Sequence, residues 1–202
     1  MSAIAVFGGT FNPFHKGHEE MLGALCAIDA VDKVLIIPTK IPPHKSVDYL
    51  ASDDDRLSMC RLVASEYKKA EVSDLELLRE GKSYTIDTIK SLKELYPDDA
   101  IYLCIGGDML TSFTAWREYK EILRLVKLVA FKRQTTDNDE FLKSLSALLS
   151  EGADILVPDV VVTDISSTEI REHIEKGRLR DEFLPSKVFD YINANKVYVK
   201  DV

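Results

Sequence analysis

Short runs of β-branched residues alternate along this chain with longer amphipathic segments. Such alternation is typical of βαβ units, in which helices connect parallel strands, and it predicts one doubly wound, mostly parallel α/β sheet. No linker or repeat divides the chain, so residues 1–202 are predicted to form a single domain, with a small C-terminal helical part at about residues 165–202. The predicted strands cover Ala3–Gly8, Lys33–Thr39, Ala70–Leu75, Ala100–Ile105, Lys127–Phe131 and Ala153–Val157. The predicted helices cover Gly17–Ala30, Asp53–Tyr67, Thr85–Tyr96, Tyr119–Leu125, Asp137–Ser150, Ser167–Lys176 and Ser186–Asn195.

Acidic residues outnumber basic ones, which limits the partners of the chain. Lys and Arg total 26 and Asp and Glu total 34, so the net charge is −8. Binding to DNA or RNA depends on neutralising many phosphates, so we expect no nucleic-acid partner. An anionic small molecule is compatible with this composition if positive charge is concentrated locally.

Apolar runs such as Val34–Ile37 are strand-sized and fall well short of the roughly 20 residues that cross a bilayer. Residues 1–7 carry no basic group before a glycine pair, unlike a signal peptide. We therefore expect no membrane partner and a cytoplasmic location. Cys26, Cys60 and Cys104 lack Cys-x-x-Cys spacing and nearby histidines, which predicts buried reduced thiols.

The first predicted strand ends in the run GGTFNPFHKGH, residues 8–18. Ligands of doubly wound sheets bind at the carboxyl ends of the strands. The glycine pair lets a ligand approach the backbone, and the helix that follows favours phosphate at its start. His15 and His18 are spaced so that they can converge and donate hydrogen bonds to phosphate oxygens. A metal pair completed by Glu19 or Glu20, or a structural histidine, remains the alternative.

This run closely resembles the signature Gly-Thr-Phe-x-Pro-x-His-x-Gly-His of the nucleotidyltransferases. Further segments over nearly the whole chain narrow the resemblance to the bacterial nicotinate-nucleotide adenylyltransferases. The resemblance implies a Rossmann-like nucleotidyltransferase fold and transfer of an adenylyl group from ATP to nicotinate mononucleotide, giving deamido-NAD and pyrophosphate in NAD biosynthesis. It also implies ATP and nicotinate mononucleotide as partners, and Mg²⁺ bound mainly through the ATP phosphates with no protein metal site.

Two of these segments meet the acceptor in the family. PTKIPPHK, residues 38–45, resembles the Pro-Pro-His-Lys loop, in which prolines stiffen a positively charged tip, although an ordinary proline-rich turn has the same composition. SYTIDT, residues 83–88, resembles the segment whose backbone helps to bind the nicotinate carboxylate. Ser83 or Thr85 would also serve as a helix N-cap there.

The fourth predicted strand ends in GGDML, residues 106–110, which resembles the family's Gly-x-Asp segment. The resemblance implies that Asp108 accepts hydrogen bonds from ribose hydroxyls. Trp116 follows and would offer a flat face to a pyridine ring, whereas packing in the core is its plain structural alternative.

The last segment is ISSTEIR, residues 165–171, which matches the Ile-Ser-Ser-Thr-x-x-Arg signature of the superfamily. Ser166 with Glu169 predicts a capping box, which would start a helix in any protein. A capping box does not explain Arg171, and the resemblance implies a clamp for the β- and γ-phosphates of ATP.

The resemblance carries over a set of functional residues by position. The catalytic group is His15, His18, Lys45 and Arg171. The ATP-binding group is Gly8, Gly9, Thr10, Phe11, His15, His18, Gly106, Asp108, Ile165, Ser166, Ser167, Thr168 and Arg171. The substrate-binding group is Asn12, His44, Lys45, Ser83, Tyr84, Thr85, Trp116 and Arg117.

Two positions depart from the family pattern. Asn12 stands where many relatives have Asp, and the Pro-Gly that often follows the arginine is missing after Arg133. The phosphate-binding loops are nevertheless expected to form a local positive cleft in an acidic protein, with Lys16, Lys40, Lys45 and Arg171 as its cations. The alternatives left open are nicotinamide mononucleotide or phosphopantetheine as acceptor, a nucleotide-binding regulator without catalysis, and a structural interaction module. The oligomeric state is also left open, a homodimer included.

Overall fold

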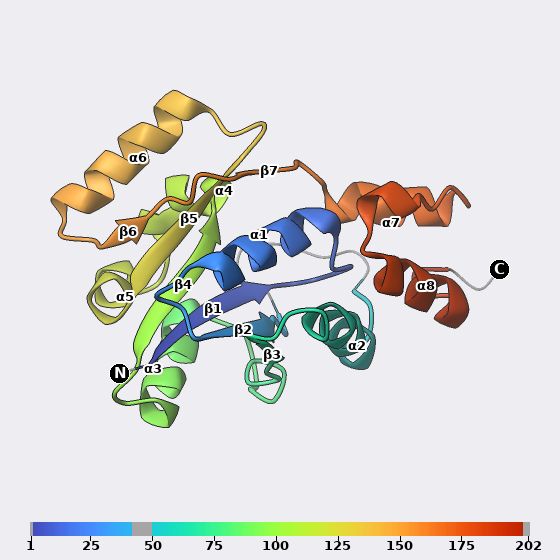
Figure 1. Ribbon diagram of the computed structural model, residues 1–202, viewed down its shortest axis with the longest axis horizontal. Helices are drawn as coiled ribbons and strands as arrows, with labels where there is room; N and C mark the ends of the chain where they lie inside the picture. Colours follow the sequence, from blue (N-terminus) through green and yellow to red (C-terminus); the bar gives the residue numbers. More distant parts are fainter. Residues whose placement is uncertain (1, 42–49, 200–202) are drawn as a thin grey trace.

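A computed structural model describes residues 2–41 and 50–199 of the chain. Its strands form one parallel sheet in the order β3-β2-β1-β4-β5-β6, and β7 pairs with the end of β5 (Figure 1). The doubly wound, Rossmann-like α/β fold predicted from the sequence is confirmed. The strands are β1 (Ala3–Gly9), β2 (Lys33–Pro38), β3 (Ala70–Val72), β4 (Ala100–Gly106), β5 (Lys127–Arg133), β6 (Ile155–Leu156) and β7 (Val161–Val162).

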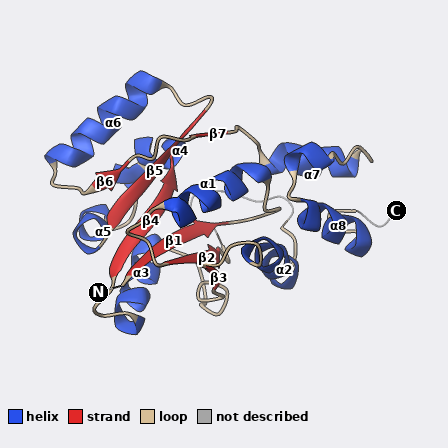
Figure 2. Ribbon diagram, viewed as in Figure 1, coloured by secondary structure: helices blue, strands red, loops and turns tan. Residues whose placement is uncertain are grey.

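Helices cover both faces of this sheet (Figure 2). One apolar cluster joins the sheet to α1, α2, α7 and α8, and a second cluster joins the opposite face to α3, α4, α5 and α6. The helices are α1 (Lys16–Ala27), α2 (Asp53–Ala64), α3 (Thr85–Leu95), α4 (Gly107–Thr111), α5 (Tyr119–Leu125), α6 (Asn138–Ser150), α7 (Ser167–Glu175) and α8 (Ser186–Asn195), with 3-10 turns at Phe113–Ala115 and Asp181–Phe183.

Burial on both faces explains why β1 is apolar throughout. Successive side chains of a strand point to opposite faces, so Ile4 and Val6 enter one cluster while Ala5 and Phe7 enter the other. All four are at most 2% exposed. The run therefore lacks the polar alternation of a half-exposed strand.

The structure differs from the sequence prediction mainly at element ends and in short elements. The first helix ends at Ala27, where Ile28 turns into extended backbone, and the third strand ends at Val72. The predictions missed α4, β7 and both 3-10 turns, because such short elements show no periodicity. Cys60 and Cys104 are buried as expected, but Cys26 is partly exposed, so that prediction was wrong for one thiol. No helix in residues 2–41 and 50–199 is long and apolar enough to cross a membrane.

The chain reverses its winding direction at β1. One connection leads from β1 to β2, whereas the neighbour on the other side is β4, far along the sequence. The connections around such a switch point run over opposite faces of the sheet, which leaves a crevice at the carboxyl ends of the two central strands.

Arg56 in α2 links two of the strand ends beside this crevice. Its side chain is fully buried, and Nη1 donates to the carbonyl oxygens of Thr10 at 3.0 Å and Thr39 at 2.6 Å. Nη2 forms an ion pair with Asp53. Because a buried carbonyl without a partner is costly, this arginine stabilises the loops after β1 and β2 together.

We expect Arg56→Ala to lower the free energy of unfolding by about 2–4 kcal/mol, because it removes a fully buried side chain, the donor to two half-buried carbonyls and the partner of Asp53. Urea denaturation followed by circular dichroism measures this change. Arg61→Ala is the matched control, since Arg61 lies on the exposed face of the same helix. Equal stability of the two variants would contradict the role given to Arg56.

Candidate functional site

A cavity of about 410 Å³ opens at the carboxyl ends of β1 and β4. This is the crevice expected at the switch point of the sheet. It brings together residues from segments far apart in the sequence. Of the residues assigned a role from the sequence, those lining the cavity are Gly8, Gly9, Thr10, Phe11, Asn12, His15, His18, Ser83, Tyr84, Thr85, Gly106, Asp108, Trp116, Arg117, Ile165, Ser166, Ser167, Thr168 and Arg171. His44 and Lys45 lie outside the described residues.

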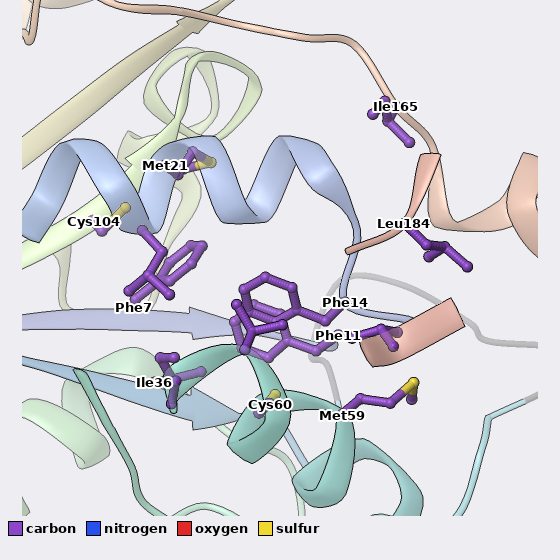
Figure 3. Packing of buried hydrophobic residues seen from close by; sticks show 14 of the residues in the cluster. Phe7, Phe11, Phe14, Met21, Ile36, Met59, Cys60, Cys104, Ile165 and Leu184 are labelled. Carbon is purple, nitrogen blue, oxygen red and sulfur yellow. The ribbon is translucent and has the colours of Figure 1, made fainter. Parts of the chain in front are cut away.

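The loop after β1 presents backbone to the cavity and side chains to the core. A Cβ atom added at Gly8 would meet no other atom within 4 Å, so the bare backbone faces open space. The rings of Phe11 and Phe14 stack 5.1 Å apart near the end of β1 and pack against Phe7, which lies between β1 and α1 (Figure 3). Phe11 is only 1% exposed, so its ring belongs to the core.

His15 and His18 cap the start of α1 for each other. The backbone N–H of His18 donates to Nδ1 of His15, and the backbone N–H of His15 donates to Nδ1 of His18, both at 3.3 Å. The two rings stack with their centres 3.6 Å apart. Because each Nδ1 accepts a hydrogen bond, the neutral rings carry their protons on Nε2. The structural role of these histidines therefore fixes which nitrogen can donate to a ligand.

His15 is 4% exposed, and it is held neutral. Burial, with a smaller effect from the positive charge of Arg133, lowers the pKa of His15 from 6.5 to about 3. An anion near this ring would meet an N–H dipole and no full positive charge. The sequence left a metal pair open, but both Nδ1 atoms are engaged by backbone. In the described part of the chain no group of three or more His, Cys, Asp and Glu side chains could hold a metal ion.

The start of α7 is attached to the loop after β1. Nη1 of Arg171 donates to the carbonyl oxygen of Asn12 at 2.8 Å, and the Ser167 hydroxyl donates to the carbonyl oxygen of Pro13 at 3.3 Å. Ser166 is the N-cap residue, but its side chain makes no capping hydrogen bond, so the predicted capping box is wrong. The helix start is held instead by these links to the loop.

Asn12 lines the cavity, yet its side chain is 2% exposed. Its Oδ1 accepts hydrogen bonds from the backbone N–H of Ala51 at 3.0 Å and from the hydroxyl of Tyr198 at 2.9 Å. A neutral amide suits this position because burying a carboxylate costs more. The side-chain oxygen is thus used to hold the loop, and contact of Asn12 with substrate stays a prediction.

The opposite wall comes from the start of α3 and the turn before α5. Tyr84 is the N-cap of α3 and makes no side-chain cap, so capping by Ser83 or Thr85 is wrong. The Ser83 hydroxyl accepts from the backbone N–H of Lys40 at 3.3 Å. Trp116 packs on Phe113 with the ring centres 4.9 Å apart, and it also lines the cavity. Contact of its ring with a pyridine stays a prediction.

Two charged residues of the cavity lining were not assigned a role from the sequence. Glu76 is 6% exposed, and its Oε1 accepts from the Thr88 hydroxyl at 2.7 Å. Burial raises the pKa of this carboxyl, and hydrogen bonds oppose the rise. Arg133 points into the cavity, with Nη1 at 3.9 Å from Asp164. A single acidic residue in the irregular stretch after β3 gives no sequence signal, whereas Arg133 was visible as a cation at a strand end.

The charged side chains lining the described cavity are three arginines and two carboxylates. They are Arg117, Arg133, Arg171, Glu76 and Asp108. Lys16 does not belong to this set. It lines a separate cavity with Glu19 and Glu66, because the first turn of α1 points it away from the strand ends. Lys40 is not a lining residue either. The positive charge of the described cavity thus comes from arginines of three different segments.

Comparisons with known proteins identify the family and agree with the fold. Residues 6–173 match the model of the cytidylyltransferase-like family. A probable nicotinate-nucleotide adenylyltransferase of Carboxydothermus hydrogenoformans is 36% identical over 96% of this chain and 97% of its own length. A protein of the same description from Fusobacterium nucleatum is 39% identical over 85% of this chain and 87% of its own. The solved structure of Plasmodium falciparum nicotinic acid mononucleotide adenylyltransferase complexed with NaAD shares the fold, with a TM-score of 0.82, 20% identity and 98% of each chain covered.

The neutral state of His15 has a consequence for stability. The unfolded chain binds a proton near pH 6.5 but the folded ring only near pH 3, so stability is complete above pH 6.5 and falls as the pH drops toward 3. We expect the His15 ring signals in NMR spectra not to titrate between pH 8 and pH 5. We also expect His15→Asn, which keeps an N-cap acceptor, to weaken the pH dependence of urea unfolding. Titration of His15 near pH 6.5 would contradict this account.

Proposed function

The chain belongs to the cytidylyltransferase-like family and, within it, to the nicotinate-nucleotide adenylyltransferases, and from this premise we propose that it transfers the adenylyl group of ATP to nicotinate mononucleotide. The products are deamido-NAD and pyrophosphate, which places the enzyme in NAD biosynthesis. The observation that carries the proposal is the convergence of His15, His18 and Arg171 on one cavity at the switch point of the sheet.

The reaction is a displacement at phosphorus. An oxygen of the mononucleotide 5′-phosphate attacks the α-phosphorus of ATP, and the bond from that phosphorus to the bridging oxygen of the β-phosphate breaks. Pyrophosphate leaves with the bonding electrons, so no covalent bond to the enzyme forms. Because phosphate is already a competent nucleophile, the protein contributes position and charge neutralisation rather than a base.

The loop after β1 and the start of α1 suit the α-phosphate. The backbone at Gly8 allows close approach, and we assign the Nε2 side of the His15 and His18 rings to the phosphate, because their Nδ1 atoms are used in the reciprocal cap. Donors already oriented for the developing charge stabilise a transition state without reorganisation. We assign the backbone of Thr10 and Phe11 to the same nucleotide.

The start of α7 suits the β- and γ-phosphates. Arg171 donates one hydrogen bond to the carbonyl oxygen of Asn12 and one to the hydroxyl of Thr168. A guanidinium carries further N–H groups that can bind phosphate. These two bonds also hold its planar group in place. Ile165, Ser166, Ser167 and Thr168 complete this part of the proposed ATP site, and Gly106 and Asp108 are assigned to the ribose.

The wall of Ser83, Tyr84, Thr85, Trp116 and Arg117 is the proposed nicotinate subsite. Backbone N–H groups at the start of α3 suit the carboxylate, and the Trp116 ring offers a flat face. His44 and Lys45, predicted to bind the mononucleotide phosphate, and the catalytic role of Lys45 remain predictions from the sequence.

Mg²⁺ fits this donor set as a metal carried by the substrate. Mg²⁺ prefers oxygen ligands and is commonly held by phosphates and water with few protein ligands. The described residues include no cluster of three or more metal-binding side chains. An ion that is bound through phosphates does not need such a cluster. When bound, it would neutralise charge on the triphosphate. The single-domain organisation of residues 1–202 and a cytoplasmic location stay predictions from the sequence, which left the oligomeric state open.

We expect His18→Ala to lower kcat by a factor of about 10²–10³, because it removes a donor aimed at the developing charge. Pyrophosphate release measures the rate, and circular dichroism verifies the fold. His173→Ala is the matched control, since His173 lies in α7 and is not a cavity residue. Near-normal turnover of His18→Ala would overturn the mechanism.

Turnover with alternative acceptors tests the substrate. We expect kcat/KM with ATP to be higher for nicotinate mononucleotide than for nicotinamide mononucleotide or phosphopantetheine, because the predicted subsite offers donors and a cation to a carboxylate. A preference for either alternative would correct the acceptor. ATP binding without pyrophosphate release for any acceptor would favour a regulator that has lost catalysis.

A further inference from the structure

Arg117 is a cation on the cavity wall that carries the proposed nicotinate subsite. Its guanidinium carbon lies 4.9 Å from the centre of the Tyr84 ring, and both residues line the cavity. Arginine binds an aromatic face through its planar group, which leaves the N–H edge pointing outward. The contact joins the turn before α5 to the start of α3, so it places a positive charge beside the backbone of Ser83–Thr85.

The charge of Arg117 is only weakly compensated by its neighbours. Its Nε lies 3.6 Å from Oε1 of Glu118, whereas Oε2 of the same carboxylate lies 2.8 Å from Nζ of Lys90. Glu118 is thus shared between two cations and held more closely by Lys90. The Arg117 side chain is 55% exposed, so it can also turn toward a ligand at small cost.

The other described cavity arginines belong to different segments. Arg133 lies at the end of β5 near Asp164, and Arg171 is held by Asn12 across the cavity mouth. Glu76, by contrast, carries its carboxyl on the wall near Ser83, with Thr88 as its hydrogen-bond donor. A negative group there disfavours an anionic ring substituent. Arg79 is the cation that acts on Glu76, but it does not line the cavity, so Arg117 is the described cavity arginine on this wall.

Nicotinate and nicotinamide differ in two ways that a protein can use. A carboxamide has an NH2 group where the carboxylate has its second oxygen, so paired backbone N–H donors favour the acid, and the acid also carries a full negative charge. The full negative charge of the acid is what a cation senses. We propose that the charge of Arg117 strengthens the preference for the acid over the amide mononucleotide beyond what the backbone N–H groups supply, an inference that rests on the proposed function.

The test measures kcat/KM for the acid and for the amide mononucleotide, each with ATP as co-substrate. The proteins compared are the wild-type enzyme, Arg117→Gln, Arg117→Lys and Arg124→Gln. We expect Arg117→Gln to lower kcat/KM for the acid about threefold to tenfold, the scale of a partly exposed ion pair, and to leave the amide within about twofold. Arg117→Lys should retain an intermediate preference, because it keeps the charge and loses the stacking fork. Arg124→Gln is the matched control and should change neither rate, since Arg124 is 78% exposed, pairs with Glu121 at 3.4 Å and does not line the cavity.

An unchanged acid-to-amide ratio in Arg117→Gln, or an equal loss for both substrates, would overturn the inference while leaving the proposed function intact. A wild-type enzyme that releases pyrophosphate with neither mononucleotide would overturn the proposed function, and the inference with it.

The dependence of the acid preference on ionic strength is a second readout, and its wild-type part does not depend on the folding of a variant. Raising the ionic strength should reduce the wild-type preference for the acid and should have little effect on Arg117→Gln; salt dependence that is the same in both proteins would contradict the proposal.

Discussion

The carbonyl oxygens of the loop after β1 are satisfied by side chains from later parts of the chain. Arg56 in α2 bonds to the carbonyl of Thr10, and Arg171 in α7 bonds to that of Asn12. The Tyr198 hydroxyl, near the end of the described chain, bonds to the Asn12 side chain. Because polar backbone groups must find partners when buried, the loop cannot hold its shape without these segments. The start of α7, in the C-terminal helical part, therefore belongs to the site.

The reciprocal cap of His15 and His18 combines a structural and a chemical task in one arrangement. Capping the first turn of α1 uses both Nδ1 atoms, while both histidines also line the cavity. Burial keeps His15 neutral, so it offers a dipole where a phosphate is expected. Full positive charges stand farther apart, on Arg117, Arg133 and Arg171. Neutral donors at the loop and cations farther away suit a reaction in which negative charge is redistributed over a phosphoryl group.

Some of this could be predicted from the sequence with good physical reason. The apolar runs of β1 and β4 predict strands buried on both faces, and glycines directly after them predict a ligand near the backbone. The positive charge was predicted less well. Lys16 follows His15 directly, but the helical turn carries it to another surface, and Lys40 is not part of the cavity lining. Helix starts were also misjudged, since Ser166 has the residue type of a cap while its hydroxyl makes no capping bond.

Local patterns thus determined the order of strands and helices, the parallel sheet and the strand-end position of the site, because periodicity and glycine placement act over a few neighbouring residues. Only the tertiary structure decided which side chains share the cavity. Glu76, Arg56 and Tyr198 acquire their roles from partners far away in sequence, and no local pattern records such contacts. The same holds for Arg117, whose place against Tyr84 depends on how α3 and α5 pack on one face of the sheet.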